Sequence, residues 1–481
     1  MQKNMELKKI TIKNYKSIDY LEIPLNRVNG SLTFSLLGVN ESGKSSILKA
    51  ISFISKSDAK FPEDYFNTDE SIKIAFHYTL EAHEKKEILE KIDEDFKPPK
   101  KFLSQVVLEE LELIKNIANT AQATVTKEQF FSFKKHTLNG FKIENQTIVV
   151  DKESKIYLED LFEEKYKNHF WTSMHKIVFW KSEDKFLISR NINLANFASN
   201  PNTSIPLKNC FHLVGIDTAK IQSEINKLND PASISNLVER LNDKVTEHIK
   251  RVWANHPIKL KFNINNNILV LLVEDEGVKY AVKTTNQRSD GFRQFVSFLL
   301  TISIENLNEE LNNTILLLDE PETHLHPTAQ LNLKDELLNI SKSTVNNVVF
   351  YATHSNYLID KSNLNRSFKI EKENNLKTVI QKISKIKTSY SEINFEIFDI
   401  PTNDYHNELY GFIKDNSPTK LNEIPKDRTW IKHPSKKEFK VSLCEYIRHS
   451  IHHPENTLNR KFTDAQLRKS INIMRKIKDN I

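Results

Sequence analysis

Two kinds of hydrophobic pattern recur along the chain, and together they predict an α/β fold. Residues 7–13 and 18–25 alternate apolar and polar side chains, which is the pattern of strands with one buried face. The runs 314–318 and 348–352 are almost wholly apolar, and the run 32–37 is apolar apart from Thr33 and Ser35. Continuous apolar strands are typical of a parallel sheet that is covered on both faces. The sequence therefore predicts a mostly parallel core sheet, preceded by two alternating strands near the N-terminus.

The middle of the chain departs from this strand-rich pattern. After a strand predicted at 72–80, residues 84–118 are highly charged and favour helix, and apolar residues recur at helical spacing between 221 and 249. A short strand-like run lies at 177–180 within this region. Strand patterns return at 258–262 and 268–273. We therefore predict four parts: an N-terminal lobe of residues 1–82, an inserted α-rich subdomain of residues 83–255, a second lobe of residues 256–385 and a helical C-terminal domain of residues 386–481.

A glycine-containing motif joins the apolar run at 32–37 to a helix predicted at 46–54. It reads G-x-x-x-x-G-K-S from Gly38 to Ser45, and the chain has only 8 glycines in all. In this context backbone N–H groups surround phosphates, Lys44 reaches the β and γ oxygens and the Ser45 hydroxyl ligates Mg²⁺. We expect a nucleotide phosphate site formed by Gly38, Asn40, Glu41, Ser42, Gly43, Lys44, Ser45 and Ser46.

Polar residues follow the other two apolar strands directly. Asp319 and Glu320 come after the strand at 314–318, and Thr353, His354 and Ser355 follow the strand at 348–352. Ligands gather at the carboxyl ends of parallel strands. Asp319 is expected to bind Mg²⁺ through water and Glu320 to polarise an attacking water. We expect the His354 side chain to donate a hydrogen bond to a γ-phosphate.

Composition narrows the class of protein further. The chain has 481 residues, 38% of them hydrophobic, which is enough for two to four domains. No apolar run approaches the ~18 residues of a membrane-spanning helix, and the N-terminus opens into a strand without a signal-peptide core. We expect a cytoplasmic protein with no membrane contact. Cys210 and Cys444 have no C-x-x-C partner and are expected to be packing residues.

The positive charge is concentrated at the C-terminal end. The net charge is +6, and residues 401–481 hold 16 Lys and Arg against 10 Asp and Glu. Two interpretations stand: a surface for nucleic acid phosphates, or the ordinary solvated face of helices. The basic residues concerned are Lys432, Lys436, Lys437, Lys440, Arg460, Lys461, Arg468, Lys469, Arg475, Lys476 and Lys478.

The motifs in their order resemble one family. Asn14-Tyr15-Lys16-Ser17-Ile18, the loop 38–45, Ser289-Asp290-Gly291, the segment 319–327 (D-E-P-E-T-H-L-H-P) and Thr353-His354-Ser355 are similar to the RecF/SMC/OLD branch of ABC-type ATPases. The resemblance covers residues 5–82 and 256–385. It implies an ABC-type P-loop ATPase head that hydrolyses ATP to ADP and phosphate.

The resemblance also implies an assembly and further site residues. The family's active unit is a head-to-tail homodimer that holds two ATP molecules between protomers. Ser289 and Gly291 would reach the γ-phosphate bound by the partner's loop, although Ser-Asp-Gly-Phe-Arg is a loose version of the family's L-S-G-G-Q motif. His354 would be the switch histidine and Lys16 a nucleotide contact. Residues 321–327 would lie at the dimer interface.

The C-terminal region departs from one branch of this family. OLD nucleases carry a metal-dependent Toprim domain that needs a D-x-D pair, and no D-x-D follows Asp360. The arrangement instead resembles the ATPase subunits of two-gene bacterial antiphage systems, most closely the Septu type (PtuA) and more weakly the PARIS type. By this resemblance the chain would be an ATP-dependent regulatory subunit that controls a separate HNH nuclease, with nucleic acid as the target.

Two alternatives make different demands on the C-terminal region. Arg448 and His453 fit R-x-x-x-x-H, the pattern of HEPN ribonucleases, in which these residues act on the RNA 2′-OH and scissile phosphate. That spacing also arises at ordinary helix ends. The other alternative is a DNA-repair ATPase of RecF type, a DNA-binding module without a nuclease.

Overall fold

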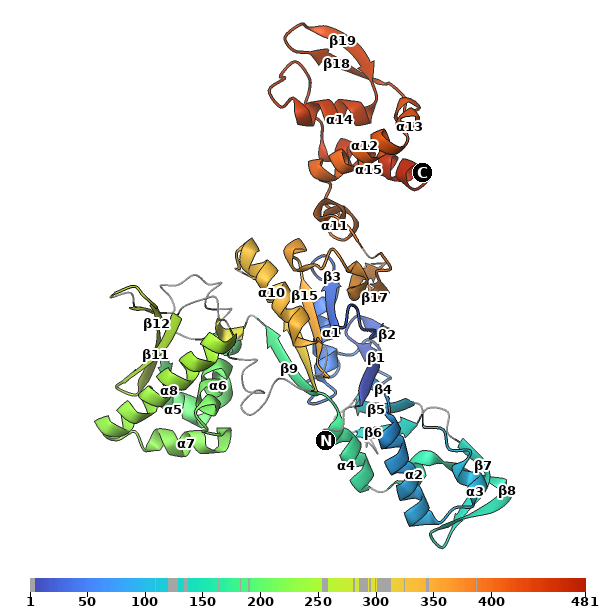
Figure 1. The fold of residues 1–481 in the computed structure, drawn as a ribbon, viewed down its shortest axis with the longest axis vertical. Helices are drawn as coiled ribbons and strands as arrows, with labels where there is room; N and C mark the ends of the chain where they lie inside the picture. The colour runs from blue at the N-terminus through green and yellow to red at the C-terminus, as the bar shows by residue number, and fades with distance from the viewer. Residues whose placement is uncertain are drawn as a thin grey trace. The chain divides into compact units, whose positions relative to one another are not determined.

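The structure is a computed structural model that describes residues 5–108, 110–119, 129–133, 137–162, 164–181, 183–188, 191–252, 258–279, 282–284, 293, 296–298, 300, 313–323, 325–342, 346–374, 376–385 and 387–481. The chain divides into two compact units (Figure 1). The first comprises residues 1–360 and 365–383, and the second comprises residues 361–364 and 384–481.

The centre of the first unit is a six-stranded, mostly parallel sheet, which confirms the predicted fold class. Its strand order is β17-β16-β3-β15-β14-β9. The parallel strands are β16 (Ser367–Glu373), β3 (Thr33–Leu37), β15 (Val348–Thr353), β14 (Thr314–Asp319) and β9 (Lys176–Lys181), and β17 (Lys377–Lys382) is antiparallel to β16. Thr353 pairs with Leu37 and Asp319 pairs with Ala352. The carboxyl ends of β3, β15 and β14 therefore meet at one edge of the sheet.

The apolar strands are buried on both faces, as their composition predicts. In β14, Ile315 and Leu317 belong to one hydrophobic core and Leu316 and Leu318 to another. The first core is completed by α1 (Lys44–Ser52) and by the antiparallel sheet described below, and the second by the helical layer and α10 (Pro327–Ile340). Side chains alternate between faces along a strand, so a strand between two cores must be apolar throughout.

A second, antiparallel sheet covers the first core. It has the order β2-β1-β4-β5-β6, formed by β2 (Ile18–Pro24), β1 (Glu6–Tyr15), β4 (Ile72–Thr79), β5 (Glu110–Ile117) and β6 (Gln129–Phe133). The strands predicted at 7–13, 18–25 and 72–80 are therefore confirmed. Around this sheet lie α2 (Ala82–Phe96), α3 (Lys100–Leu103), α4 (Glu164–Ser173) and the hairpin of β7 (Thr137–Glu144) and β8 (Thr147–Tyr157) (Figure 1).

Two expectations for the inserted segment 83–255 are wrong. The helix expected over 84–118 ends at Leu103, and 110–117 form β5. Leu111 and Leu113 alternate with polar residues and are buried where β5 pairs with β4. This alternation favours a strand, and it decides the structure although the charged composition favours a helix. The strand-like run at 177–180 is β9, which pairs in parallel with β14 inside the core sheet rather than belonging to an insertion.

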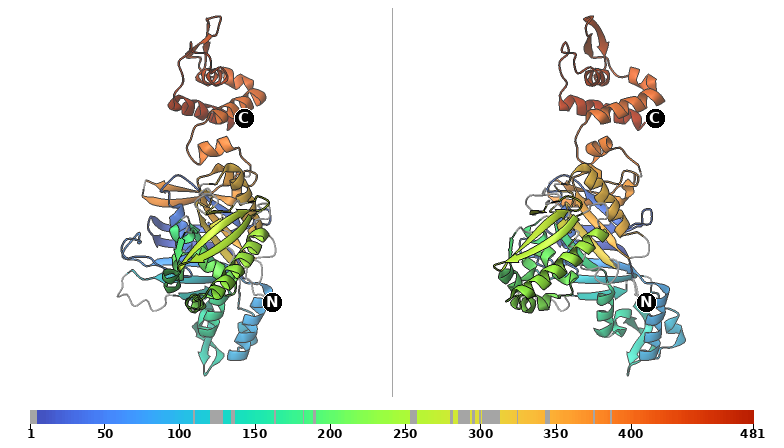
Figure 2. Two further views of the ribbon diagram at one scale, coloured as in Figure 1. Left: turned by 90° about the vertical axis from the view of Figure 1, so that its left-hand side faces the viewer. Right: turned by 60° about the vertical axis from the view of Figure 1, so that its left-hand side comes forward.

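The helical layer lies within the remaining part of that segment. It contains α5 (Leu194–Ser199), α6 (Ile205–Leu213), α7 (Thr218–Asn226) and α8 (Pro231–Val252), packed on a sheet of β10 (Asn191–Asn193), β12 (Ile268–Asp275), β11 (Ile258–Asn265) and β13 (Val282–Thr284). The helix α8 runs beside the β11–β12 hairpin (Figure 2). Thr246 Oγ1 of α8 accepts the Leu260 N–H and donates to its carbonyl. The strands predicted at 258–262 and 268–273 thus pack with the helical layer.

The second unit is a small helical domain with one hairpin. It contains α11 (Tyr390–Glu396), α12 (Asn403–Asn416), α13 (Pro418–Asn422), α14 (Leu443–His452) and α15 (Asp464–Lys478), together with β18 (Arg428–Lys432) and β19 (Lys437–Val441). Its core joins apolar residues of α12, α14 and α15, including Leu409, Ile447 and Ile471. The helices were expected, but the hairpin was not. Short 3₁₀ helices of the two units lie at Leu158–Leu161, Asp184–Phe186, Pro201–Thr203, Asn356–Leu358 and Leu364–Arg366.

Candidate functional site

The loop between β3 and α1 has the shape that its glycines permit. Gly43 precedes α1 with a φ of 108°, in the left-handed region that favours glycine. A Cβ there would lie 2.4 Å from Thr378 Oγ1 of β17, and a Cβ on Gly38 would lie 2.3 Å from the Ile370 carbonyl oxygen of β16. Both glycines therefore let the loop close against the β16–β17 hairpin.

The Lys44 side chain is turned back over this loop. Its Nζ donates to the Gly38 carbonyl over 2.9 Å and to the Val39 carbonyl over 3.0 Å. Burial lowers the pKa of the Lys44 ammonium to about 8, against the opposing field of Glu320 and Asp319. The ammonium is thus held in place with incomplete charge compensation, which suits it to an anionic ligand.

The hydroxyl of Ser45 meets the first of the predicted acidic residues. Ser45 Oγ donates to Asp319 Oδ1 over 2.8 Å. Burial raises the pKa of the Asp319 carboxyl, and the hydrogen bond from Ser45 opposes that shift. A serine hydroxyl and a carboxylate are hard oxygen donors of the kind that Mg²⁺ prefers, and Mg²⁺ completes its shell with waters and phosphates. The two residues therefore fit the predicted magnesium role.

The second acidic residue and the predicted histidine form a pair. Glu320 has a φ of 51°, and its N–H donates to the Ala352 carbonyl over 3.0 Å. His354 Nε2 lies 3.2 Å from Glu320 Oε1. Burial lowers the pKa of the His354 imidazole, the charge of Lys44 lowers it further, and Glu320 opposes both effects. Glu320 is held on a backbone turn at the sheet edge with an imidazole beside it, in position to act on a water.

A third carboxylate, which the sequence did not reveal as a site residue, fixes the histidine loop. Glu322 is 7% exposed, and its Oε1 accepts from Thr353 Oγ1 over 2.6 Å and from the His354 N–H over 2.9 Å. Burial raises the pKa of the Glu322 carboxyl, opposed by these two hydrogen bonds. Glu322 thus ties the end of β15 to the turn after β14.

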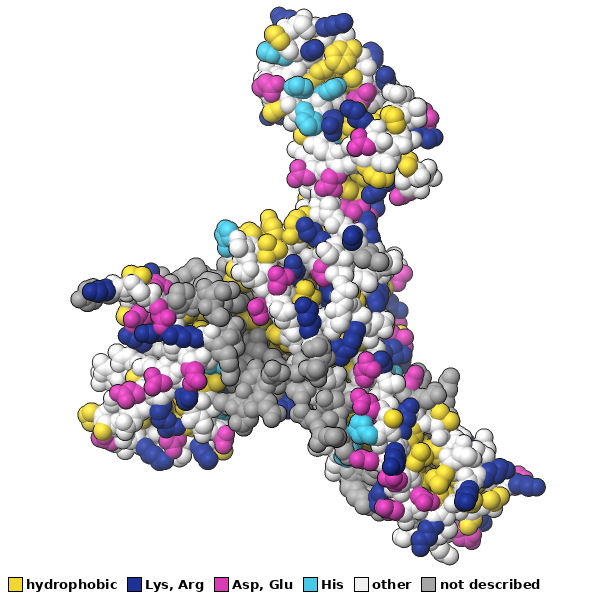
Figure 3. Space-filling view, in the orientation of Figure 1, with side chains coloured by type: hydrophobic (Ala, Val, Ile, Leu, Met, Phe, Trp, Pro, Cys, Tyr) yellow, Lys and Arg dark blue, Asp and Glu magenta, His cyan; other side chains and the backbone are white. Residues whose placement is uncertain are grey.

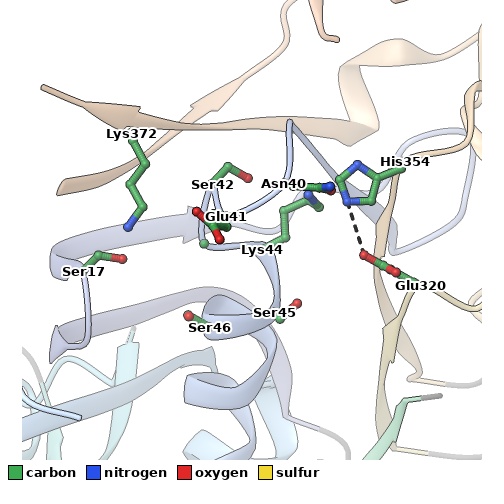
Figure 4. A pocket seen from close by; sticks show the side chains of 11 residues that line it. Ser17, Asn40, Glu41, Ser42, Lys44, Ser45, Ser46, Glu320, His354 and Lys372 are labelled. Carbon is green, nitrogen blue, oxygen red and sulfur yellow. Dashed lines mark ion pairs between the residues drawn. The ribbon is translucent and has the colours of Figure 1, made fainter. Parts of the chain in front are cut away.

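These groups line one cavity of about 460 Å³ at the sheet edge (Figure 4). The predicted residues Asn40, Glu41, Ser42, Gly43, Lys44, Ser45, Ser46, Glu320 and His354 all line it, together with Ser17 and Lys372, which were not predicted. Gly38 and Asp319 contact the lining through Lys44 and Ser45. The buried Ser42 Oγ has no hydrogen-bond partner among the described residues, so a ligand oxygen here would satisfy it.

One wall of the cavity comes from segments far from the loop in sequence. Thr378 Oγ1 of β17 donates to the Ser42 carbonyl over 3.1 Å and lies 2.8 Å from Ser17 Oγ. Lys372 of β16 extends toward Ser17 across the opening (Figure 4). The predicted contact Lys16 instead places its ammonium 3.5 Å from Asp64, and its neighbour Ser17 lines the cavity. Ser17 belongs to the 14–18 motif, which could have pointed to it, whereas no sequence motif marks Thr378 or Lys372.

The other predicted site residues are not brought to this cavity. Ser289 and Gly291 lie outside the described residues. The Arg448 guanidinium lies over the Tyr410 ring, 4.6 Å from its centroid, whereas His453 lies 3.4 Å from Glu455 with its ring tilted beside that of His449. The R-x-x-x-x-H spacing therefore turns the two side chains toward different neighbours. Among the described residues no group of three or more His, Cys, Asp or Glu could hold a metal ion, and no described helix is long and apolar enough to cross a membrane.

Comparisons with known proteins bear on the first unit. The family model described as AAA ATPase domain matches residues 5–359. The Old nuclease of Escherichia phage P2 is 27% identical over 114 residues, which are 23% of this chain and 19% of that protein. An uncharacterized protein of Methanocaldococcus jannaschii is 28% identical over 136 residues, which are 27% of this chain and 34% of that protein. The matches thus span from a fifth to a third of these relatives.

Solved structures with some likeness are heads of SMC proteins. The SMC head domain from Thermotoga maritima has 14% sequence identity and a TM-score of 0.37, covering 79% of this chain and 100% of that chain. An SMC head bound to the C-winged helix domain of ScpA has 12% identity and a TM-score of 0.40, covering 79% of this chain and 98% of that chain.

Proposed function

The chain belongs to the AAA ATPase domain family, and from that premise we propose that it binds ATP with Mg²⁺ and hydrolyses ATP to ADP and phosphate. One observation carries the proposal: Lys44, the Ser45–Asp319 pair and the Glu320–His354 pair converge at a single sheet edge. The Ser45–Asp319 pair joins segments about 270 residues apart in sequence, and the Glu320–His354 pair joins segments about 30 residues apart. Such convergence is what phosphoryl transfer to water requires.

The residues divide the work by their chemistry. The Lys44 ammonium would hold the phosphate oxygens, since it already sits on the loop carbonyls with a lowered pKa. Ser45 and Asp319 would hold Mg²⁺, which when bound neutralises phosphate charge. Glu320 would accept the proton of the attacking water. Burial lowers the pKa of His354, and the single N–H of its neutral imidazole would be donated either to Glu320 or, once ATP is bound, to a phosphate oxygen.

We propose further that the ATPase acts as a homodimer. The family resemblance places Ser289 and Gly291 against the phosphates bound by the partner subunit. The cavity is open and polar, which leaves room for groups from a second chain. Closure of two nucleotides between protomers would supply the differential binding energy that a nucleotide-driven switch needs.

The finer proposal is that this switch belongs to a bacterial antiphage system of the Septu (PtuA) type and controls a separate nuclease of the HNH type. The order of motifs supports this proposal, and so does the similarity to a protein that is named a nuclease, the Old nuclease of phage P2. The 481 residues hold no D-x-D pair after Asp360, and we accordingly assign cleavage to a partner nuclease. Co-expression of the chain with a candidate HNH protein, followed by co-purification and a phage plaque assay, tests this level.

The ATPase proposal has a direct test in steady-state hydrolysis and equilibrium ATP binding. Glu320→Gln is expected to lower kcat by about 100-fold or more while ATP still binds, because the amide cannot accept the proton. Lys44→Ala is expected to abolish ATP binding itself. Glu336→Gln makes the same chemical change at an exposed position of α10 and serves as the control. Undiminished hydrolysis in Glu320→Gln would refute the role of Glu320.

A further inference from the structure

The β18–β19 hairpin and the end of α14 bring four aromatic and imidazole rings into contact on the second unit. Trp430 and Phe439 are paired across the hairpin. Both rings contact His449 of α14: the Trp430 ring is tilted against it with centroids 5.2 Å apart, and the Phe439 ring meets it edge-on at 6.3 Å. The His453 ring lies tilted beside His449 at 6.5 Å. We call these four side chains the ring cluster. Figure 3 shows histidine and hydrophobic side chains gathered on one face of this unit, with Lys and Arg side chains around them.

The ring cluster is anchored at one end and exposed at the other. Trp430 is 3% exposed and packs edge-on against Tyr446. Phe439 is 38% exposed, and the His453 side chain is 55% exposed. A buried Trp holds the hairpin on α14 while two flat rings remain open to solvent. Fixed aromatic faces of this kind are platforms on which unpaired bases stack.

The charge around the ring cluster is positive and is not compensated. Residues 428–461 hold 8 Lys and Arg against 3 Asp and Glu. Lys432 and Lys437 are exposed and directly opposite each other across the hairpin, on the same face as Trp430 and Phe439. Within the part of the chain that the structure describes, neither lysine has a carboxylate at salt-bridge distance. Like charges placed opposite on a hairpin destabilise it, and an anion between them would relieve the repulsion.

Other basic residues of the same unit are already paired. Arg468 bonds Asp399, Arg475 Nη2 lies 2.6 Å from Glu396, and Lys478 Nζ lies 3.5 Å from Glu392. These side chains tie α15 to α11 and the loop after it. Part of the basic C-terminal sequence is thus structural, whereas Lys432 and Lys437 beside the ring cluster have no such pairing among the described residues.

We propose that the β18–β19 hairpin and the end of α14 bind single-stranded nucleic acid, with phosphates at Lys432 and Lys437 and a base on Phe439. Unpaired bases expose the faces that stacking requires, whereas a duplex hides them, so the rings select a single strand. The proposal goes beyond the ATPase and does not depend on it, because none of these residues lines the nucleotide cavity.

The test is fluorescence anisotropy on the full chain with labelled 20-nucleotide RNA, DNA of the same sequence and the matching DNA duplex. The wild-type chain should bind a single strand more tightly than the duplex, with affinity that falls as salt rises. Lys432→Ala/Lys437→Ala should weaken binding about 10-fold or more and reduce the salt slope by about 1.4, from two lost phosphate contacts. Phe439→Ala should weaken binding about 10-fold at an almost unchanged salt slope.

A matched control makes the same charge change elsewhere on this unit. Lys469→Ala/Lys476→Ala removes two exposed lysines of α15 and should leave the affinity within about twofold of wild type, because phosphate contacts act locally. Equal losses in the two double variants would overturn the proposal, as would duplex binding equal to single-strand binding. If no probe binds at low salt, the proposal is also overturned, and a protein becomes the expected ligand of this surface. ATP hydrolysis, followed in parallel, should stay unchanged in all variants, so a failed ATPase proposal is recognised separately.

Discussion

Acid is expected to destabilise the second unit through one buried histidine. His406 of α12 has no exposed surface, its Nε2 lies 3.0 Å from Ser470 Oγ of α15, and its ring stacks on Tyr410. Burial lowers the pKa of His406 to about 4 from an ordinary 6.5, and the nearby charge of Arg448 adds to the shift. The neutral imidazole therefore stabilises the helix packing above pH 6.5, and that stability is lost as pH falls toward 4.

The size of the effect follows from these two pKa values. In the unfolded chain His406 binds a proton below pH 6.5. Each further pH unit of acidification therefore lowers the free energy of unfolding by about 1.4 kcal/mol. Between pH 7.5 and pH 5 the free energy of unfolding should fall by about 2 kcal/mol, which raises the open population about 30-fold. The lowered pKa belongs to a fully buried ring, so solvent screening does not reduce this figure substantially.

Hydrogen exchange of peptides from α12 and α15 in the full chain measures this population, after correction for the intrinsic pH dependence of exchange. His406→Gln retains a hydrogen-bonding group toward Ser470 but does not titrate, so its open population should change less than about threefold over the same range. His433→Gln, at an exposed histidine of the hairpin turn, is the control and should behave like wild type. A wild-type response no larger than that of His406→Gln would refute the reasoning.

Three further predictions concern the nucleotide cavity. Gly43→Ala should weaken binding of a fluorescent ATP analogue at least about 10-fold, because its Cβ would lie 2.4 Å from Thr378 Oγ1 at a φ of 108°, whereas Gly215→Ala, at a φ of 79° in open space, should leave binding unchanged. Because phosphate binding should raise the Lys44 pKa from about 8, ATP affinity should fall about fivefold between pH 8 and pH 9 by calorimetry, and a flat profile matching that of Lys44→Arg would contradict this. Glu322→Leu should leave two buried donors unpaired and lower kcat more than it changes KM, while Glu322→Gln, which retains an acceptor, should lose less; equal effects of the two changes would contradict the positioning role.

Where motifs are contiguous, the sequence alone located residues that the structure brings together at one cavity. The loop from Gly38 to Ser45, the acidic pair after β14 and the histidine after β15 each follow an apolar strand directly. Strands that are apolar throughout must be covered on both faces, so the sequence also implied a parallel sheet whose carboxyl ends meet. The meeting of Ser45 with Asp319 follows from that rule alone.

The sequence misled where pairing partners decided the outcome. The charged composition of β5 favours helix, yet β4 offers an open edge and Leu111 and Leu113 have the alternation to fill it. The strand β9 lies in the middle of a segment that reads as an insertion, and only its register with β14 shows that it belongs to the core sheet. Lys16 matched a motif, but the turn directs its ammonium to Asp64.

By itself, the sequence determined the fold class, the position of the glycine-containing loop and the three polar side chains at the strand ends, because hydrophobic period and local motif are properties of neighbouring residues. Only the tertiary structure decided that Ser17 and Lys372 complete the cavity wall, that Thr378 is hydrogen-bonded to the loop behind it, and that Glu322 holds the histidine loop. It also separated the paired arginines of α15 from the uncompensated lysines of the hairpin. Each of these depends on which distant side chain lies within hydrogen-bond or ion-pair distance, and composition and spacing do not contain that information.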